Sequence, residues 1–275
     1  MSLNITFPKA PKANDSLILC LFEARKLGSD AAKIDKKLGG FITNALKNNP
    51  GFKAANGQTL NLGAPVKSEY ANITLLGLGK PESLTVLKAE EAGGKLYIAL
   101  KTLGLKSATL ITEKTKKLSN NLIAAHLANG ANLRSYNFNN YKSKPKTKNP
   151  TPKSLALIAN DSAKAKKTYT TLNATAQGTF FARNLVNTAP NDLYPDSYAK
   201  IIAKELKPLG VTVEILDDKK LSTLKMGGIT AVGQGSARKP RMVIMRWNGA
   251  PKSAKNKTPP LGFVGKGVTF DTGGI

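Results

Sequence analysis

The chain has 275 residues and carries 42 lysines and arginines against 17 acidic residues, which gives a formal charge of +25. Hydrophobic residues make up 41% of the sequence and charged residues 21%, a balance that excludes a disordered or collagen-like protein. Because a domain takes about 100–200 residues, the length predicts two domains or one large one.

The basic excess is mostly lysine: 36 of the 42 cations are lysine and 6 are arginine. Arginine is the side chain suited to bidentate contacts with phosphates and bases, so this bias disfavours a sequence-specific nucleic-acid interface. The cations are also spread along the chain, with 23 cations and 9 acids in residues 1–150 and 19 cations and 8 acids in residues 151–275. Neither half is a basic tail.

The cysteine and apolar patterns indicate a cytoplasmic protein. The single cysteine, Cys20, cannot form an intramolecular disulfide, and its apolar neighbours predict a small buried side chain in a strand rather than a reactive thiol. The first twenty residues lack the continuous apolar region of a signal peptide. No apolar run reaches the length of about 20 residues that a membrane-spanning helix needs.

The first part of the chain alternates short apolar runs with longer helical patterns. The predicted strands are Leu3–Phe7, Ser16–Phe22, Asn72–Gly77, Ser107–Thr112 and Ser154–Asn160, and the predicted helices are 30–47, 83–103, 120–133 and 163–186. Gly93-Gly94 is expected to weaken the middle of the second helix. Strands separated by helices of this length predict crossover connections and a largely parallel sheet.

The segment 141–154 contains three prolines and five lysines without apolar periodicity, so it is predicted to be a loop. The strand that follows it would complete the first sheet. We therefore place the domain boundary after that strand, with an N-terminal α/β domain over residues 1–163 and a second domain over residues 164–275.

The second part also alternates helices and strands. The predicted helices are 196–206 and 219–225, and the predicted strands are Val211–Leu216, Met242–Trp247 and Leu261–Val264. The fold class predicted for both parts is therefore α/β.

The most informative stretch is the last one, LGFVGKGVTFDTGGI. The apolar run Leu261–Val264 is followed by Lys266 and then by Asp271, with glycines on either side. Ligands of open α/β sheets bind at the carboxyl ends of strands, so both side chains stand where a site is expected. Taken alone, the pattern is ambiguous, because a lysine and an aspartate near one strand end more often form a solvated ion pair than a site, and such glycines are common in turns.

This stretch resembles the start of the metal-binding core of the leucyl (cytosol) aminopeptidase family. Three further stretches resemble the same family in the same order: LLGLGK at Leu75–Lys80, ARNLVNTAPNDLY at Ala182–Tyr194 and GGITAVGQGS at Gly227–Ser236. The resemblance implies a macro-like N-terminal α/β domain followed by the truncated start of an α/β two-metal aminopeptidase domain.

The resemblance also implies a chemistry. Lys266 and Asp271 match two metal ligands of a site that holds two divalent cations, Mn²⁺ or Zn²⁺, and Asp271 matches the carboxylate that contacts both. A carboxylate can bridge two cations, as two-metal hydrolases require. Only the neutral amine of Lys266 could bind a metal, so metal affinity should fall as pH falls. The implied reaction is release of N-terminal amino acids from peptides by a metal-activated water.

The family's other ligands and its catalytic lysine and arginine match positions after Ile275, so no catalytic residue is expected within this chain. We therefore expect an N-terminal fragment that does not hydrolyse peptides alone. The resemblance implies a homohexamer for the full-length protein.

Two other candidate sites are weaker. The stretch Gly77–Lys80 lacks the spacing of a phosphate-binding loop, and a strand-to-helix turn is the favoured interpretation. His126, the single histidine, lies among apolar helix residues without a second histidine or cysteine nearby, which favours a packed side chain over a metal ligand. The alternative to a peptidase is a non-catalytic nucleic-acid-binding or regulatory protein that uses the charge of +25.

Overall fold

The computed structural model describes residues 3–12, 15–66, 68–143, 151–250 and 259–270. The chain divides into two compact units, an N-terminal unit of residues 1–182 and a C-terminal unit of residues 183–275. The long helix α5 (Ser162–Asn187) runs through this division. The domain boundary that we place at residues 163/164 stays a prediction.

The N-terminal unit is built on a six-stranded sheet with the order β1-β6-β5-β2-β4-β3. The strands in that order are β1 (Asn4–Thr6), β6 (Ser154–Ile158), β5 (Ser107–Ile111), β2 (Ser16–Leu21), β4 (Asn72–Gly77) and β3 (Thr59–Gly63). Five of the strands are parallel, and β3 pairs antiparallel with β4 at one edge. The predicted parallel sheet is confirmed.

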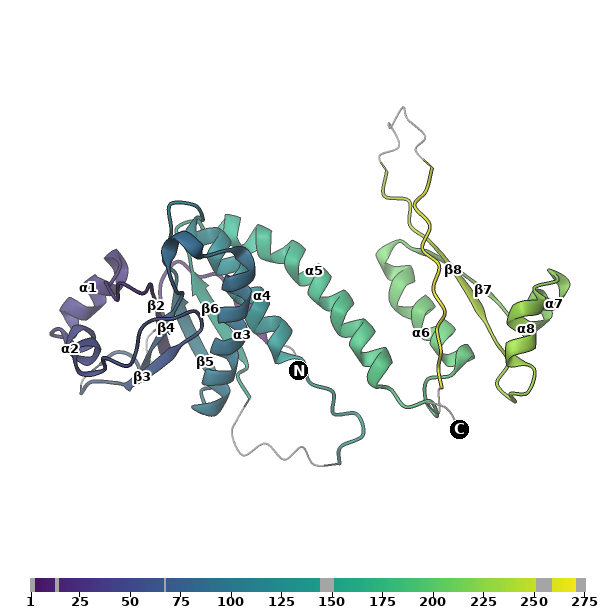
Figure 1. Ribbon diagram of the computed structural model, residues 1–275, viewed down its shortest axis with the longest axis horizontal. Helices are drawn as coiled ribbons and strands as arrows, with labels where there is room; N and C mark the ends of the chain where they lie inside the picture. The colour runs from purple at the N-terminus through teal and green to yellow at the C-terminus, as the bar shows by residue number, and fades with distance from the viewer. Residues whose placement is uncertain (1–2, 13–14, 67, 144–150, 251–258, 271–275) are drawn as a thin grey trace. The chain divides into compact units, whose positions relative to one another are not determined.

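Helices cover both faces of this sheet (Figure 1). On one face lie α1 (Ser29–Lys37) and α2 (Phe41–Asn48), and on the other lie α3 (Val86–Thr102), α4 (Asn120–Ser135) and α5. The central strand β2 is buried along its whole length, with Ile18 and Cys20 in the core under α3 and α4 and its leucines in the core under α1 and α2. An unbroken apolar strand is typical of a sheet that is covered on both sides.

The prediction of one continuous helix over residues 30–47 is wrong, because the structure has two helices there, α1 and α2. Gly39 and Gly40 both have positive φ, 64° and 79°, and they end α1 and start α2 in a new direction. Glycine adopts these angles without a steric penalty, so the pair breaks a pattern that is otherwise helical. The apolar spacing continues through the break because both helices pack on the same face of the sheet.

Helix α3 is continuous through Gly93-Gly94, and Gly93 serves the packing of α3 against α4. A Cβ added to Gly93 would overlap the carbonyl oxygen of Leu127, and one added to Gly130 would overlap the carbonyl oxygen of Glu90. The two backbones therefore lie in direct contact at both glycines. The packing gained there offsets the low helix propensity of glycine.

The sequence patterns missed the edge strand β3. Its residues Thr59–Gly63 are half-buried rather than clearly alternating, and its register with β4 shifts between Asn61 and Gly63. A short, irregular edge strand leaves little signal in the sequence.

The C-terminal unit contains the end of α5, α6 (Pro195–Leu206), β7 (Thr212–Leu216), α7 (Asp218–Thr223), α8 (Gly227–Gly233) and β8 (Met242–Arg246), with β7 and β8 paired antiparallel. The helices predicted at 196–206 and 219–225 and the strands predicted at 211–216 and 242–247 are confirmed within a few residues. The strand predicted at Leu261–Val264 is wrong, because residues 259–270 contain no helix or strand. A strand needs a neighbour for its backbone N–H and C=O groups, and apolar residues alone do not supply one.

The described helices include none that is both long enough and apolar enough to cross a membrane.

Candidate functional site

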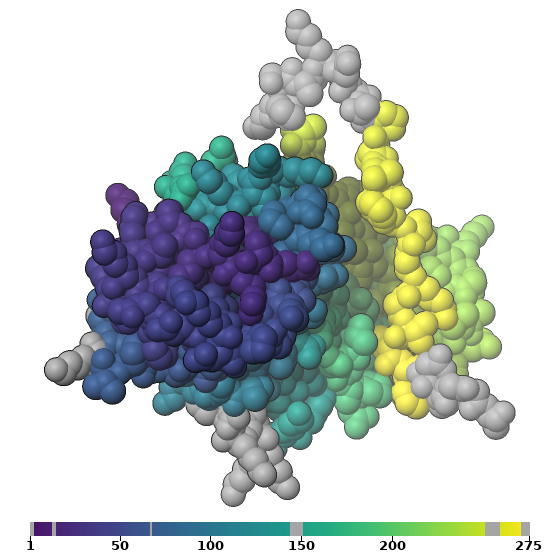
Figure 2. Space-filling view, turned by 60° about the vertical axis from the view of Figure 1, so that its left-hand side comes forward, coloured from purple at the N-terminus to yellow at the C-terminus, as the bar shows by residue number. Residues whose placement is uncertain are grey.

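Lys266, the first of the two predicted metal ligands, lies in the extended segment 259–270 of the C-terminal unit. Its side chain is exposed, as are most residues of that segment, which forms the yellow chain on the surface in Figure 2. The next residue, Gly267, lies against α6, since a Cβ added there would stand 3.0 Å from Cε1 of Tyr198.

Asp271, the second predicted ligand, lies outside the described residues, so the geometry of the Lys266–Asp271 pair stays a prediction. Within the described ranges, no group of three or more His, Cys, Asp or Glu side chains is arranged to hold a metal ion. A single exposed amine is not a metal site. The part of the chain that the structure describes therefore does not form a metal centre by itself.

Arg238 connects two of the stretches that resemble the family, Ala182–Tyr194 and Gly227–Ser236. No pattern in the sequence predicts this role. Arg238 follows the GGITAVGQGS stretch, and its Nη1 donates hydrogen bonds to the carbonyl oxygens of Pro190 and Asn191, at 3.0 and 3.1 Å. Its guanidinium also lies 4.0 Å from the centroid of the Tyr194 ring. One arginine thus ties the loop after α8 to the loop before α6, two segments more than forty residues apart.

A second arginine, Arg241, joins α6 and α7. Its Nε lies 3.3 Å from Oδ1 of Asp196, and its Nη1 lies 3.1 Å from Oδ1 of Asp218. Asp196 also pairs with Lys200 at 2.7 Å. The hydrogen bond from Lys200, together with the charges of Lys200 and Arg241, lowers the pKa of Asp196 against a smaller opposing effect of desolvation. Only the short-range spacing of Asp196 and Lys200 is visible in the sequence.

The stretch Gly77–Lys80 is a structural turn, in agreement with the favoured interpretation. The N–H groups of Gly77, Leu78 and Gly79 donate to the carbonyl oxygens of Gln58, Leu21 and Ala54, at 2.8, 2.8 and 2.9 Å. A phosphate-binding loop needs free N–H groups that point at its ligand. These three are used inside the fold, so the loop cannot cradle a phosphate without losing them.

His126 contacts the neighbouring helix. Its Nδ1 lies 2.8 Å from Oε1 of Glu90 in α3, and Nδ2 of Asn129 donates to the same oxygen at 3.0 Å. The contact joins α3 and α4 near the glycine-mediated approach of their backbones. The histidine is therefore a packed side chain between two helices, as the sequence pattern favours.

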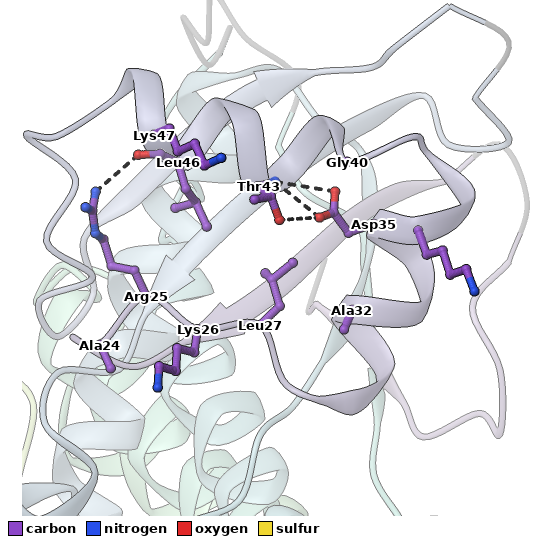
Figure 3. A pocket seen from close by; sticks show the side chains of 11 residues that line it. Ala24, Arg25, Lys26, Leu27, Ala32, Asp35, Gly40, Thr43, Leu46 and Lys47 are labelled. Atoms are coloured by element: carbon purple, nitrogen blue, oxygen red, sulfur yellow. Dashed lines mark hydrogen bonds between the residues drawn. The ribbon is translucent and has the colours of Figure 1, made fainter.

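The N-terminal unit contains a cavity of about 540 Å³ between the loop after β2 and α2. Its lining residues are Ala24, Arg25, Lys26, Leu27, Ala32, Asp35, Lys36, Gly40, Thr43, Leu46 and Lys47. Leu27 and Leu46 point toward one another from opposite sides of the cavity in Figure 3. It lies at the carboxyl end of the central strand β2, where open α/β sheets bind ligands.

Two charged residues of this cavity also hold α2 in place. Asp35 is 6% exposed, and its carboxylate accepts hydrogen bonds from the backbone N–H groups of Ile42 and Thr43 and from the Thr43 hydroxyl. At the other end of α2, Nη1 of Arg25 donates to the carbonyl oxygens of Leu46, Asn49 and Phe52, at 3.2 to 3.3 Å. An acid at the start of a helix and a cation at its end both interact favourably with the helix dipole.

Comparison with known proteins identifies the family. Residues 18–145 match the family model described as "Cytosol aminopeptidase family, N-terminal domain", and residues 180–275 match the model described as "Cytosol aminopeptidase family, catalytic domain". The chain belongs to the cytosol aminopeptidase family. The resemblance drawn from its motifs is thereby confirmed.

Curated relatives in this family align along the whole chain. A probable cytosol aminopeptidase of Wolbachia pipientis wMel is 33% identical over 276 residues, which cover 100% of this chain and 52% of the relative. One of Rhodopseudomonas palustris (strain BisA53) is 38% identical over 272 residues, which cover 98% of this chain and 53% of the relative. The chain thus spans about half the length of the relatives it matches.

Solved structures agree with the fold of the cytosol aminopeptidase family. A mutant of tomato leucine aminopeptidase superposes with a TM-score of 0.73 at 23% identity, over 88% of this chain and 50% of that one. The bottromycin maturation enzyme BotP in complex with Mn gives a TM-score of 0.65 at 22% identity, over 86% of this chain and 46% of that one. The predicted fold class, an N-terminal α/β domain followed by the start of a second α/β domain, is confirmed.

Proposed function

We propose that this chain is the N-terminal portion of a metal-dependent aminopeptidase that releases N-terminal amino acids from peptides. The observation that carries the proposal is the match of residues 180–275 to the catalytic domain of the cytosol aminopeptidase family, because this segment contains Lys266 and Asp271. BotP, which shares the fold, was solved with Mn. The relatives' names also support a cytosolic location.

In this proposal Lys266 and Asp271 are ligands of a pair of divalent cations, Mn²⁺ or Zn²⁺. The amine would provide one nitrogen ligand after loss of its proton, and the carboxylate would provide oxygen ligands to both cations. When bound, such a metal pair activates water and polarises a peptide carbonyl. The described residues add no acidic cluster that would complete the site, so a competent centre needs ligands from outside them.

The same reasoning predicts that this chain alone does not hydrolyse peptides. The relatives are about twice as long, and the half that this chain does not match is where we expect the remaining ligands, the catalytic side chains and the contacts of a homohexamer. Peptides are accordingly the proposed substrates of the longer assembly.

The test compares the chain alone with a chimera in which it is joined to the second half of the Rhodopseudomonas palustris relative. With Mn²⁺ present, the chimera should hydrolyse a leucine anilide and the chain alone should not. In the chimera, Asp271→Ala should abolish hydrolysis, whereas Glu205→Ala, an exposed acid on α6, should not affect it. Full activity of the Asp271→Ala chimera would refute the ligand assignment, and an inactive but folded chimera would count against the peptidase proposal.

A further inference from the structure

The cavity at the carboxyl end of β2 is lined by both aliphatic and basic side chains. The hydrogen bonds of Arg25 and Asp35 to α2 do not explain this combination. Four of the cavity's lining residues are aliphatic: Leu27 and Leu46, which point toward one another in Figure 3, and Ala24 and Ala32. Its lining contains four cations, Arg25, Lys26, Lys36 and Lys47, and one acid, Asp35. This combination of an apolar lining and a basic rim suits a ligand with an apolar body and an anionic group.

The single acid does not neutralise the rim. Both oxygens of the Asp35 carboxylate accept hydrogen bonds from the first turn of α2, where the charge is balanced by the positive end of that helix. Among the described residues, no acidic side chain forms an ion pair with Lys26, Lys36 or Lys47. The cavity therefore keeps a positive potential within the screening length of about 8–10 Å.

Arg25 supplies a fixed hydrogen-bonding edge. All three of its hydrogen bonds to carbonyl oxygens start from Nη1. A guanidinium has five N–H donors, so Nε and Nη2 keep donors that no described residue of the protein accepts. Because Nη1 already holds the group in place, this edge loses little freedom when it binds a planar anion in a bidentate manner.

The backbone of Arg25 adopts a rare conformation. Its φ is 52°, in the left-handed region that non-glycine residues rarely adopt. A strained residue persists when its surroundings over-determine its conformation, and such residues concentrate at ligand sites. The face that contains α1 and α2 lies at the surface (purple in Figure 2), so a ligand can reach the cavity.

We propose that this cavity binds a carboxylate carried by an aliphatic group. The carboxylate would pair with the free Nε and Nη2 edge of Arg25 and with the ammonium group of Lys47, and the aliphatic group would cover Leu27 and Leu46. The lining contains no aromatic side chain on which a nucleotide base could stack. The ligand could be a free fatty acid or the C-terminal carboxylate of a peptide that ends in an aliphatic residue.

The binding test uses calorimetry on the purified chain with four probes. Hexanoate represents a free acid and N-acetyl-leucine a peptide C-terminus, while hexanol lacks the charge and acetate lacks the aliphatic chain. We expect saturable binding of hexanoate, of N-acetyl-leucine or of both, and at least about tenfold weaker binding of hexanol and acetate. The stronger of the first two identifies the source of the carboxylate. No binding of either at about 10 mM, or equal binding of hexanol, would refute the proposal.

Variants locate the site. Lys47→Glu, at an exposed rim position, should weaken binding by about fivefold or more, because a repulsive charge replaces an attractive one. The matched control is Lys37→Glu, an exposed residue of α1 that does not line the cavity. Equal weakening by both variants would mean general charge attraction and would also refute the proposal. Arg25→Gln should abolish binding, and since Arg25 also holds α2, its result counts only if the far-ultraviolet circular dichroism is unchanged.

Discussion

The backbone of Gly130 in α4 lies directly against the carbonyl oxygen of Glu90 in α3. One turn away, Gly93 of α3 lies against the carbonyl oxygen of Leu127 in the same reciprocal manner. Neither position has room for a Cβ, because the obstructing atoms belong to the backbone of the other helix and cannot rotate away. The close approach of the two helices therefore requires glycine, which has no Cβ, at both positions.

Alanine at either glycine should force α3 and α4 apart. We expect Gly130→Ala and Gly93→Ala each to lower the free energy of unfolding by at least about 2 kcal/mol, because overpacking displaces the surrounding core. Urea unfolding followed by circular dichroism measures the change.

Gly94 is the matched control for these substitutions. It follows Gly93 in the same helix, but the nearest atom to an added Cβ is the carbonyl oxygen of Gly130 at 3.6 Å, an ordinary contact. Because alanine favours the helical state over glycine, Gly94→Ala should raise the free energy of unfolding by up to about 1 kcal/mol. A loss equal to that of Gly93→Ala would show that the steric account is wrong.

Asp35 should contribute to stability through α2 rather than through its own helix. Its buried carboxylate satisfies the N–H groups of Ile42 and Thr43. Asp35→Ala should cost about 2–3 kcal/mol, the loss of a helix cap together with unsatisfied buried donors. Asp35→Asn, which keeps one acceptor oxygen, should cost less. Glu91→Gln, at an exposed position of α3, is the control and should stay within about 0.5 kcal/mol in urea unfolding.

The parallel sheet and its flanking helices could be predicted because their signals are local and strong. β2 and β4 are continuous apolar runs, and α3, α4 and α5 are long. The break at Gly39-Gly40 was missed because two short helices on one face of a sheet keep the apolar spacing of a single helix. Apolar periodicity shows which residues face the core, but it does not show whether the helix axis changes direction.

The two candidate metal ligands could be proposed from the sequence only as part of a motif, and they stay a prediction. Lys266 and Asp271 stand out through their glycine-flanked spacing, but the strand expected before them is absent from residues 259–264, since strand formation depends on partners that an apolar run does not encode. Arg238 makes long-range contacts, because Asn191 and Tyr194 both precede it by more than forty residues. Nothing in the local sequence distinguishes this arginine from the many other surface cations.

Cys20 should be inert in the folded protein. Burial in the core beneath α3 and α4, together with the negative charge of Glu113, raises the pKa of the thiol far above its ordinary value. The thiolate is the reactive form, so Ellman's reagent should label Cys20 only after unfolding. We expect no fast phase in native buffer at neutral or mildly alkaline pH and one thiol per chain in guanidinium chloride. Rapid labelling of the native chain would contradict the buried position.

Glu113 should make the stability of the N-terminal unit depend on pH. Desolvation and the charge of Asp30 raise the pKa of this carboxyl group above its ordinary value of 4.5, against a smaller opposing effect of Lys114. The folded state therefore holds the proton more tightly than the unfolded state, and ionisation of Glu113 favours unfolding. This contribution to stability is complete below the ordinary pKa and is lost as pH rises through the raised one.

Glu113→Gln removes that titration while keeping the size of the side chain. The difference in the free energy of unfolding between the variant and the original chain should grow in favour of the variant as pH rises from below 4.5 toward neutrality, and then stay constant. Urea unfolding of both proteins at a series of pH values measures it. Glu82→Gln, at an exposed position, controls for the loss of one negative charge from a chain with a formal charge of +25. If the two variants gave the same pH dependence, the burial of Glu113 would not be its cause.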